Sequence, residues 1–382
     1  MLMSFARALG EYELTLLSLC GSREEMETEP EDETFAEVHK VYLPKSKSYL
    51  NVLRALLGRS PLQLAYYQSD AFLRKVEELL PRHDAVIAHL VRTGQYIDRA
   101  SYRKPSVLLM SDAISLAYHR MTQLSGAHPL WHFLYRAEYK RLLSYERSAP
   151  EKFSQTWLHS EVDRSFLGLT SKSVRILPVG VDLQEFPFNP AASGDVVAFI
   201  GNMSFSLNID ACKYFVKEIF PDLRRRAGLR FRVIGACPES VRHELEKIPA
   251  VEVTGRVRRI ADALGGTFCG VCPVRGGSGI QTKILNYLAL GLPCVTSRVG
   301  LEGLNAVDGR DLLVYEDPRS AAEMILRLHG EPRLREEIAS NGRKLVETTY
   351  DYPVISRSVR ECVAELLADE SSHNRKSGCE QH

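Results

Sequence analysis

The sequence predicts an α/β protein made of two doubly wound, Rossmann-like domains. Short apolar runs alternate with longer amphipathic stretches, which is the pattern of parallel strands joined by crossover helices. The alternation occurs twice, before and after a break at 173–195 that contains three prolines. A length of 382 residues accommodates two domains of ordinary size.

Each element is predicted from its periodicity. In the first half the strand-like runs are YELTLLSLC (12–20), EVHKVYL (37–43), DAVIAHL (84–90) and PSVLLMSD (105–112). In the second half they are VVAFIG (196–201), RFRVIG (230–235), VEVTG (251–255), FCGVCPV (268–274), PCVTS (293–297) and LLVYE (312–316). Helical patterns cover 70–80, 128–147, 209–226, 240–247, 279–290 and 318–328.

These elements predict the domain limits. We expect a first domain at 1–175, a linker at 176–195 and a second domain at 196–350. A further helix is predicted at 351–368. The polar residues 369–382 are expected to be disordered.

The composition excludes several classes of protein. Hydrophobic residues make up 45% and charged residues 25% of the chain, and a net charge of +1 argues against a nucleic-acid partner. No apolar run reaches the roughly 18 residues of a membrane span. The N-terminal stretch lacks a basic region and contains Glu11 and Glu13, so we expect no signal peptide and a cytoplasmic location. Cys269 and Cys272 lack the second pair that a zinc site needs and read as part of a buried strand.

The stretch VRGGSGIQTKILNYLALGLPCVTS (274–297) carries the strongest chemical signal. A glycine-rich loop follows a buried strand and enters a helix, so backbone N–H groups and the helix dipole favour an anion there. Lys283 falls in the first helical turn, where its charge opposes the dipole unless an anion binds. Together with Arg275, this pattern favours phosphate over a merely solvated lysine. The loop lacks the G-K-[ST] of a P-loop and the third glycine of a dehydrogenase fingerprint.

The second half of the chain resembles the retaining nucleotide-sugar glycosyltransferases of family 4, which have the GT-B fold. The motifs that carry the resemblance are LPVGVDLQEF, VAFIGNMSFSLNIDACKYFVKEIFPDLRR, FRVIGACP, VEVTGRV, GGSGIQTKILNYLALGLPCVTSRVGLEGL and DGRDLLVYEDP. The stretch YKRLLSYERSAPEKFSQTWLHSEVDRSFL matches the end of the family's first domain. The branch that makes bacterial surface polysaccharides is the most similar.

The resemblance implies a nucleotide-sugar donor in the second domain, an acceptor in the first and catalysis in the cleft between them. It implies no metal and no cofactor, because protein groups and the helix dipole stabilise the departing phosphate. The residues predicted to bind the donor are Gly201, Asn202, Arg256, Arg275, Gly276, Gly277, Ser278, Gly279, Ile280, Lys283 and Asn286.

The chain departs from the family pattern at three places. Ser278 and Asn286 stand where the family has a Glu-x7-Glu pair. The sequence GNMSFSLN replaces the usual arginine and lysine after the first strand of the second domain, so phosphate cations must come from Arg275, Lys283 or Arg256. The first domain lacks its first strand and glycine-rich loop, because Met1 falls where that loop would already have ended. We expect a misplaced start, a truncated gene or a loss of activity.

In the first domain, polar residues follow two predicted strands. His89 and Asp112 are predicted catalytic residues, and Arg92 and Ser111 are predicted to contact the acceptor. His89 fits a hydrogen-bonded packing residue equally well. Asp112 also fits the N-cap of a helix at 113–123, and the two roles are compatible.

A basic amphipathic stretch, KVYLPKSKSYLNVLRALLGRS (40–60), is compatible with peripheral membrane contact. A surface helix packed on its own core is the alternative.

The sequence therefore predicts a glycosyltransferase that moves a sugar to an unidentified hydroxyl acceptor on a glycan, lipid-linked glycan or small molecule. Three alternatives stay open. One is a non-catalytic or truncated sugar-nucleotide-binding scaffold. Another is a transferase acting on a small secondary metabolite, and the third is an epimerase or phosphorylase of the same fold.

Overall fold

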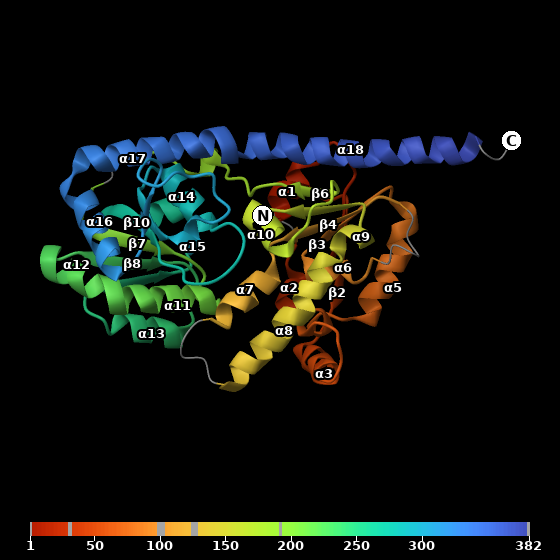
Figure 1. Ribbon diagram of the computed structural model, residues 1–382, viewed down its shortest axis with the longest axis horizontal. Helices are drawn as coiled ribbons and strands as arrows, with labels where there is room; N and C mark the ends of the chain where they lie inside the picture. Colours follow the sequence, from red (N-terminus) through yellow and green to blue (C-terminus); the bar gives the residue numbers. More distant parts are fainter. Residues whose placement is uncertain (1, 30–32, 98–103, 124–128, 191–192, 380–382) are drawn as a thin grey trace. The chain divides into compact units, whose positions relative to one another are not determined.

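The computed structural model describes residues 2–29, 33–97, 104–123, 129–190 and 193–379, which fall into two compact units. Unit 1 contains Met1–Pro178 together with Ser356–His382, and unit 2 is the continuous segment Val179–Ile355. The predicted domain limits at 175 and 196 lie on either side of the crossing from unit 1 to unit 2. Figure 1 follows the chain through both units.

Unit 2 is built on a six-stranded parallel sheet in the order β12-β11-β10-β7-β8-β9. Its strands are β7 (Val196–Ile200), β8 (Arg230–Ile234), β9 (Val251–Gly255), β10 (Thr267–Cys272), β11 (Cys294–Ser297) and β12 (Leu313–Tyr315). All six were predicted. The central strands β7 and β10 are buried along their whole length, as apolar runs covered on both faces must be.

Helices connect these strands. They are η2 (Leu183–Glu185), α11 (Ser206–Tyr214), η3 (Phe215–Ile219), α12 (Phe220–Ala227), α13 (Glu239–Glu246), η4 (Ile260–Ala263), α14 (Thr282–Leu290), α15 (Arg298–Leu301), α16 (Pro318–Gly330), α17 (Pro332–Leu345) and η5 (Val346–Tyr350). α14 ends at Gly291, whose φ of +76° is the left-handed conformation that glycine adopts without strain. Asp317 begins α16 with a capping box.

Tyr287 of α14 ties the helix to the middle of the sheet. Its fully buried hydroxyl accepts a hydrogen bond from the Ile200 N–H at 2.7 Å and lies 3.2 Å from the Ala198 carbonyl oxygen. Its ring packs on Gly270 so closely that a Cβ there would lie 2.5 Å from ring atoms. Glycine in β10 is therefore required by packing.

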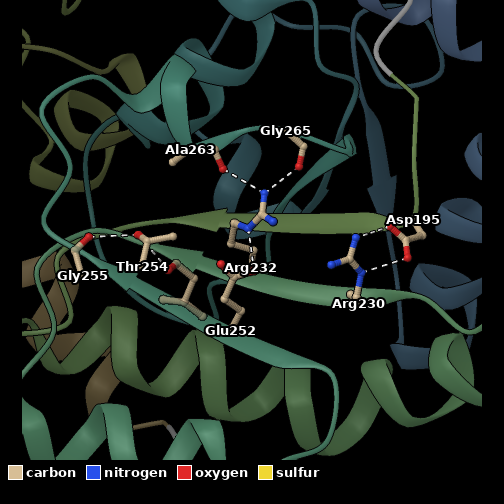
Figure 2. Close-up of polar contacts among 9 residues, drawn as sticks. Asp195, Arg230, Arg232, Glu252, Thr254, Gly255, Ala263 and Gly265 are labelled. Atoms are coloured by element: carbon tan, nitrogen blue, oxygen red, sulfur yellow. Dashed lines mark hydrogen bonds and ion pairs between the residues drawn. The ribbon is translucent and has the colours of Figure 1, made fainter.

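Ion pairs hold the far half of the same sheet, as Figure 2 shows. Arg230 makes a two-bond contact with Asp195, at 2.9 Å from Nε and 2.6 Å from Nη2. Arg232 pairs with Glu252 at 3.0 Å and donates to the carbonyl oxygens of Ala263 and Gly265, so it holds the turn before β10 against the sheet.

Unit 1 contains two separate parallel sheets, one with the order β1-β2 and one with the order β3-β4-β5-β6. The strands are β1 (Thr15–Cys20), β2 (Glu37–Tyr42), β3 (Val86–His89), β4 (Ser106–Ser111), β5 (Gln155–Leu158) and β6 (Val174–Ile176). Among the described residues β1 does not pair with β3, so the predicted lack of a strand corresponds to an interruption in the middle of this domain.

The helices of unit 1 surround both sheets. They are α1 (Leu2–Ala8), α2 (Arg23–Glu27), α3 (Lys45–Ala55), α4 (Leu62–Tyr66), α5 (Asp70–Leu79), η1 (Leu80–Arg82), α6 (Val91–Gly94), α7 (Ile114–Met121), α8 (Pro129–Arg147), α9 (Ala149–Lys152), α10 (Glu161–Leu167) and α18 (Tyr352–Cys379). α1 lies directly beneath α18 in Figure 1, and Arg360 of α18 donates to the Ala8 carbonyl oxygen at 3.4 Å.

Three expectations require correction. β5 and β6 were not predicted, because a four-residue and a three-residue strand show too little alternation. The helix expected at 351–368 extends to Cys379, so the prediction of disorder from 369 differs from the structure up to that residue. Residues 380–382 of the predicted tail lie outside the described residues. Segment 176–195 was expected to be a linker, but from Val181 on it packs on unit 2, where Val181 bridges to Asp351.

Candidate functional site

The topology of unit 2 places a crevice at the carboxyl ends of β7 and β10. The chain runs from β7 outward to β8 and β9, then continues on the other side of β7 with β10, β11 and β12. Loops that follow neighbouring strands in opposite directions separate at this point, and open α/β sheets bind ligands there. The loop after β7 and the glycine-rich loop after β10 therefore meet at one edge.

The glycine-rich loop takes backbone conformations that other residues rarely adopt. Gly277 has a φ of +119° and Gly279 a φ of +70°. Gly276 and Ile280 are also buried, and Ser278 is half-buried. The loop leads into the uncharged first turn of α14, which begins at Thr282, two residues later than the predicted start.

Lys283 is the central residue of this edge. Its side chain lies in the first turn of α14, is only 8% exposed, and donates from Nζ to Asn208 Oδ1 at 2.8 Å. The ammonium group lies 4.6 Å from the centre of the Phe199 ring. Among the described residues no carboxylate lies within 4 Å of it. A buried cation that opposes the helix dipole and has no anionic partner favours an anionic ligand.

The loop after β7 supports Lys283 through two asparagines. Asn208 Nδ2 donates to the Asn202 carbonyl oxygen at 2.9 Å, and Asn202 Oδ1 accepts from the Ser204 N–H at 2.9 Å. A Cβ on Gly201 would lie 2.8 Å from the Phe199 ring, so this turn is tightly packed. Asn208 was missed by sequence reasoning because its partner is 75 residues away along the chain.

The predicted phosphate arginines differ in how available they are. Arg275 pairs with Asp210, with Nε 3.1 Å from Oδ2, and lies 4.9 Å from the centre of the Tyr214 ring. Its charge is thus already compensated. Arg256 is exposed at the end of β9, two strands from β7, which corresponds to roughly 10 Å across a sheet. Asn286, half-buried, lies one turn after Lys283 on α14.

In unit 1 the predicted residues lie at the carboxyl ends of neighbouring strands. His89 ends β3 and Ser111 ends β4, and His159, which sequence reasoning missed, follows β5. Leu90 and Ser111 have φ values of +71° and +69°, which is strained backbone for residues other than glycine. His89 Nε2 and Ser111 Oγ are buried and find no hydrogen-bond partner among the described residues. Strain and unsatisfied polar atoms together indicate a functional edge.

The ionisation of this edge is unusual. Burial lowers the pKa of His89 to about 4, with Arg92 and His159 adding repulsion, so the imidazole is neutral at physiological pH. Burial raises the pKa of Asp112 to about 7, and the neighbouring Asp163 carboxylate raises it further in the same direction. A carboxyl group that titrates near neutrality is suited to proton transfer.

The capping role considered for Asp112 is wrong. α7 begins after Ala113 without a side-chain cap. The first amides of the helix bond elsewhere: the Ala113 N–H donates to Asp163 Oδ1 at 3.2 Å, and the Ser115 N–H to Glu146 at 3.3 Å. These two carboxylates satisfy the helix start from α10 and α8, and Asp112 is left for another role.

Arg92 points to an aromatic ring. Its guanidinium carbon lies 4.6 Å from the centre of the Tyr67 ring, and its carbonyl oxygen accepts from Gln95 at 2.8 Å. Contact of Arg92 with an acceptor stays a prediction.

The described residues contain no group of three or more His, Cys, Asp or Glu arranged to hold a metal ion. Cys269 and Cys272 lie in β10, as predicted, and burial raises the pKa of the Cys269 thiol to about 12. None of the helices in the described ranges has the length and apolar character needed to cross a bilayer.

Comparison with known proteins gives three relevant likenesses. Residues 194–331 match the family described as "Glycosyl transferases group 1". A Klebsiella pneumoniae protein, described as an uncharacterized 44.6 kDa protein in the cps region, is 20% identical over 172 residues, which is 43% of this chain. The chain spans 44% of the length of that curated relative.

Solved structures resemble nearly the whole chain. HepE of Anabaena, in complex with UDP and glucose, has a TM-score of 0.68 and 12% identity, over 95% of this chain and 94% of HepE. Sucrose-phosphate synthase of Thermosynechococcus elongatus has a TM-score of 0.71 and 14% identity, over 96% and 92%. With two units built on parallel sheets, these likenesses confirm the GT-B fold.

Proposed function

We propose that this chain is a glycosyltransferase that binds a nucleoside-diphosphate sugar in unit 2 and transfers the sugar to an acceptor hydroxyl with retention. The group 1 match over 194–331 covers the unit that holds the glycine-rich loop, and HepE was solved with UDP and glucose. The likeness to a protein of a cps region favours polysaccharide or glycoconjugate biosynthesis over small-metabolite modification.

One observation carries the proposal: the buried Lys283 ammonium has no anionic partner among the described residues, at the crevice where β7 and β10 diverge. A diphosphate there would accept a charge-assisted hydrogen bond from Lys283 and lie near the first turn of α14. The two glycines with positive φ let the backbone approach it closely.

In this mechanism the same groups act on the leaving group. As the bond between sugar and phosphate breaks, negative charge grows on the departing diphosphate. Lys283 is already held by Asn208 and needs little reorganisation to stabilise that charge. Arg275 contributes less unless it leaves Asp210. Asp112, with its pKa near 7, is the proposed proton-transfer group of unit 1, and neutral His89 is a proposed hydrogen-bond donor.

The test is calorimetric titration of wild type, Lys283→Ala and Lys217→Ala with UDP, GDP and dTDP. Lys217 is an exposed lysine of η3 and serves as the matched control. We expect at least one nucleotide to bind wild type and the control equally. Loss of a charge-assisted phosphate contact of about 1.5–3 kcal/mol should weaken binding to Lys283→Ala by roughly 10- to 150-fold. Equal binding by all three proteins would refute the assignment of Lys283.

A sugar-nucleotide-binding protein without catalysis is the second candidate. The neutral Ser278 and Asn286 and the compensated Arg275 favour it. Hydrolysis of the donor that binds separates the two: slow release of free sugar, abolished in Lys283→Ala, supports an enzyme. Tight binding without any release supports the alternative.

We also propose that α3 contacts an anionic membrane surface. Tyr49, Leu50, Leu53 and Leu57 are exposed, with Leu57 99% exposed, and Lys45, Lys47, Arg54 and Arg59 lie along the same stretch. Co-sedimentation with phosphatidylglycerol vesicles should occur at low salt and fall in the double variant Leu53→Ser/Leu57→Ser. Binding that is equal for neutral vesicles, or unchanged in the variant, would argue against this contact.

A further inference from the structure

Unit 1 contains an apolar cavity of about 820 Å³ between its two sheets. Thr15, Leu16 and Leu17 of β1 line one side, and Val86–His89 of β3 line the other. Consecutive residues of both strands line the space, whereas a strand that showed one face would contribute alternate residues. The cavity therefore faces the backbone edges of β1 and β3.

Those edges carry backbone groups without a strand partner. The N–H groups of Val86 and Leu90 donate to Pro105 and Leu109 on the β4 side, so by alternation Ile87 and His89 point their N–H groups to the cavity. On β1, the carbonyl oxygens of Leu14 and Cys20 accept from the chain at β2. Thr15 and Leu17 therefore point the other way, into the cavity.

Unit 2 supplies the template for what fits there. Its sheet reads β9-β8-β7-β10-β11-β12, and β7 is the strand that joins its two halves. In unit 1 the corresponding order is β2-β1, an interruption, then β3-β4-β5-β6. The interruption occupies the position of β7. In addition, α1 precedes β1 as α11 precedes β8, so α1 occupies the place of the helix that follows the central strand.

The walls match a strand that is buried on both faces. Leu2, Phe5 and Ala6 of α1 and Val363 of α18 lie on the walls, as do Phe72, Val76 and Leu79 of α5. A residue of a covered strand fills about 160 Å³, from a rise of ~3.3 Å, a spacing of ~4.8 Å and a layer of ~10 Å. The cavity volume thus corresponds to about five residues, the length of β7.

We propose that this cavity is the binding site of one further β-strand, apolar on both faces, that runs parallel to β1 and β3 and is covalently joined to the start of α1. The join follows from Leu2, which starts α1 and lies on the cavity wall. A turn of a few residues is enough, as between β7 and α11. The strand would unite the two sheets and satisfy the edge amides. This inference is independent of the proposed activity.

The experiment compares the 382-residue chain with two forms extended at the N-terminus. One extension carries the apolar sequence of β7, VVAFI, followed by a five-residue Gly/Ser turn. The control carries the same residues with proline at the second and fourth strand positions, which removes the N–H groups needed for pairing. Hydrogen exchange is followed at Thr15, Leu17, Ile87 and His89, with Leu16 and Ala88 as reference amides that already face β2 and β4.

We expect the four edge amides to exchange at least about tenfold more slowly in the strand form than in the proline form. We also expect melting to rise by at least about 5 °C. The free peptide VVAFI-Gly-Ser should slow the same amides at millimolar concentration, more weakly than the joined strand. Equal exchange in both extended forms would overturn the proposal.

Two other occupants give distinct results. If lauric acid raises the melting temperature of the unextended chain while the joined strand does not, the cavity is an acyl-chain site. If the unextended chain dimerises on concentration and its edge amides become protected, the strand comes from a second copy. Either result overturns the proposal as stated.

Discussion

Asp112 is the residue whose ionisation most affects unit 1. Burial and the Asp163 carboxylate raise its pKa to about 7, above the value of about 3.9 for an unfolded aspartate. The folded chain therefore holds this proton more tightly than the unfolded chain. The stabilisation is complete below about pH 4 and is lost as the pH rises to about 7.

Asp112→Asn should remove this pH dependence. We expect the variant to be more stable than wild type at pH 8, by on the order of 2 kcal/mol, because no charge is then buried. Both tryptophans, Trp131 and Trp157, belong to the sequence of unit 1, so urea unfolding followed by tryptophan fluorescence at pH 5, 6 and 8 reports on it. Asp262→Asn, at an exposed position in unit 2, is the control. A slope that persists in Asp112→Asn would contradict the assignment.

The same variant tests the proposed chemistry. If Asp112 transfers a proton, Asp112→Asn should lose at least about 100-fold in turnover of any accepted donor and acceptor pair, since general acid–base groups contribute roughly 10²–10⁴-fold. Nucleotide affinity should stay unchanged, because Asp112 lies outside unit 2. Turnover within a factor of three of wild type would exclude a catalytic role.

Residue roles were predictable only where the sequence itself carries the pattern. Lys283 and the two glycines with positive φ could be found because loop and helix are contiguous. Asn208 and Asp210, which hold Lys283 and Arg275, could not, because they come from another loop that only the fold brings close. The pairing of Arg275 is what lowers its value as a phosphate ligand.

At the scale of elements, β10 and α14 depend on one close contact. Gly270→Ala would place a Cβ 2.5 Å from the fully buried Tyr287 ring. We expect a loss of about 1–3 kcal/mol of stability from overpacking. Guanidinium unfolding followed by far-UV circular dichroism measures it.

Gly265→Ala is the matched control for this change. Gly265 precedes β10 and a Cβ there meets no atom within 4 Å. We expect its stability to stay within about 0.5 kcal/mol of wild type. If the two variants were equally stable, the contact between Gly270 and Tyr287 would not constrain the sheet.

Elements with strong periodicity were predictable, and short or covered ones were not. The six strands of unit 2 were found because each is an apolar run bounded by turn residues. β5 has only four residues, QTWL, all buried, so it shows no alternation to detect. α17 was missed because its sequence is dominated by charged residues and only a narrow stripe, including Ile338 and Ala339, is buried.

At the scale of the whole molecule, activity should not require a divalent metal. The charge on the leaving phosphate would be stabilised by Lys283 and α14, and the described residues offer no metal-binding cluster. Turnover of an accepted donor should retain at least about 80% of its rate in EDTA, since a catalytic metal is worth several kcal/mol of barrier. A rate that collapses on chelation and returns with Mn²⁺ or Mg²⁺ would require another mechanism.

α18 makes unit 1 discontinuous along the chain, and this has a consequence for biosynthesis. Val359, Val363 and Leu366 are buried, and Glu365 pairs with Arg175 at 2.6 Å. These residues are translated after all of unit 2. A ribosome therefore delivers Val179–Ile355 as an uninterrupted segment that can fold as it emerges, whereas Met1–Pro178 must wait for the last helix. The earlier-made half of the protein is the later one to be completed, and during that interval its exposed apolar surface is what a chaperone would meet.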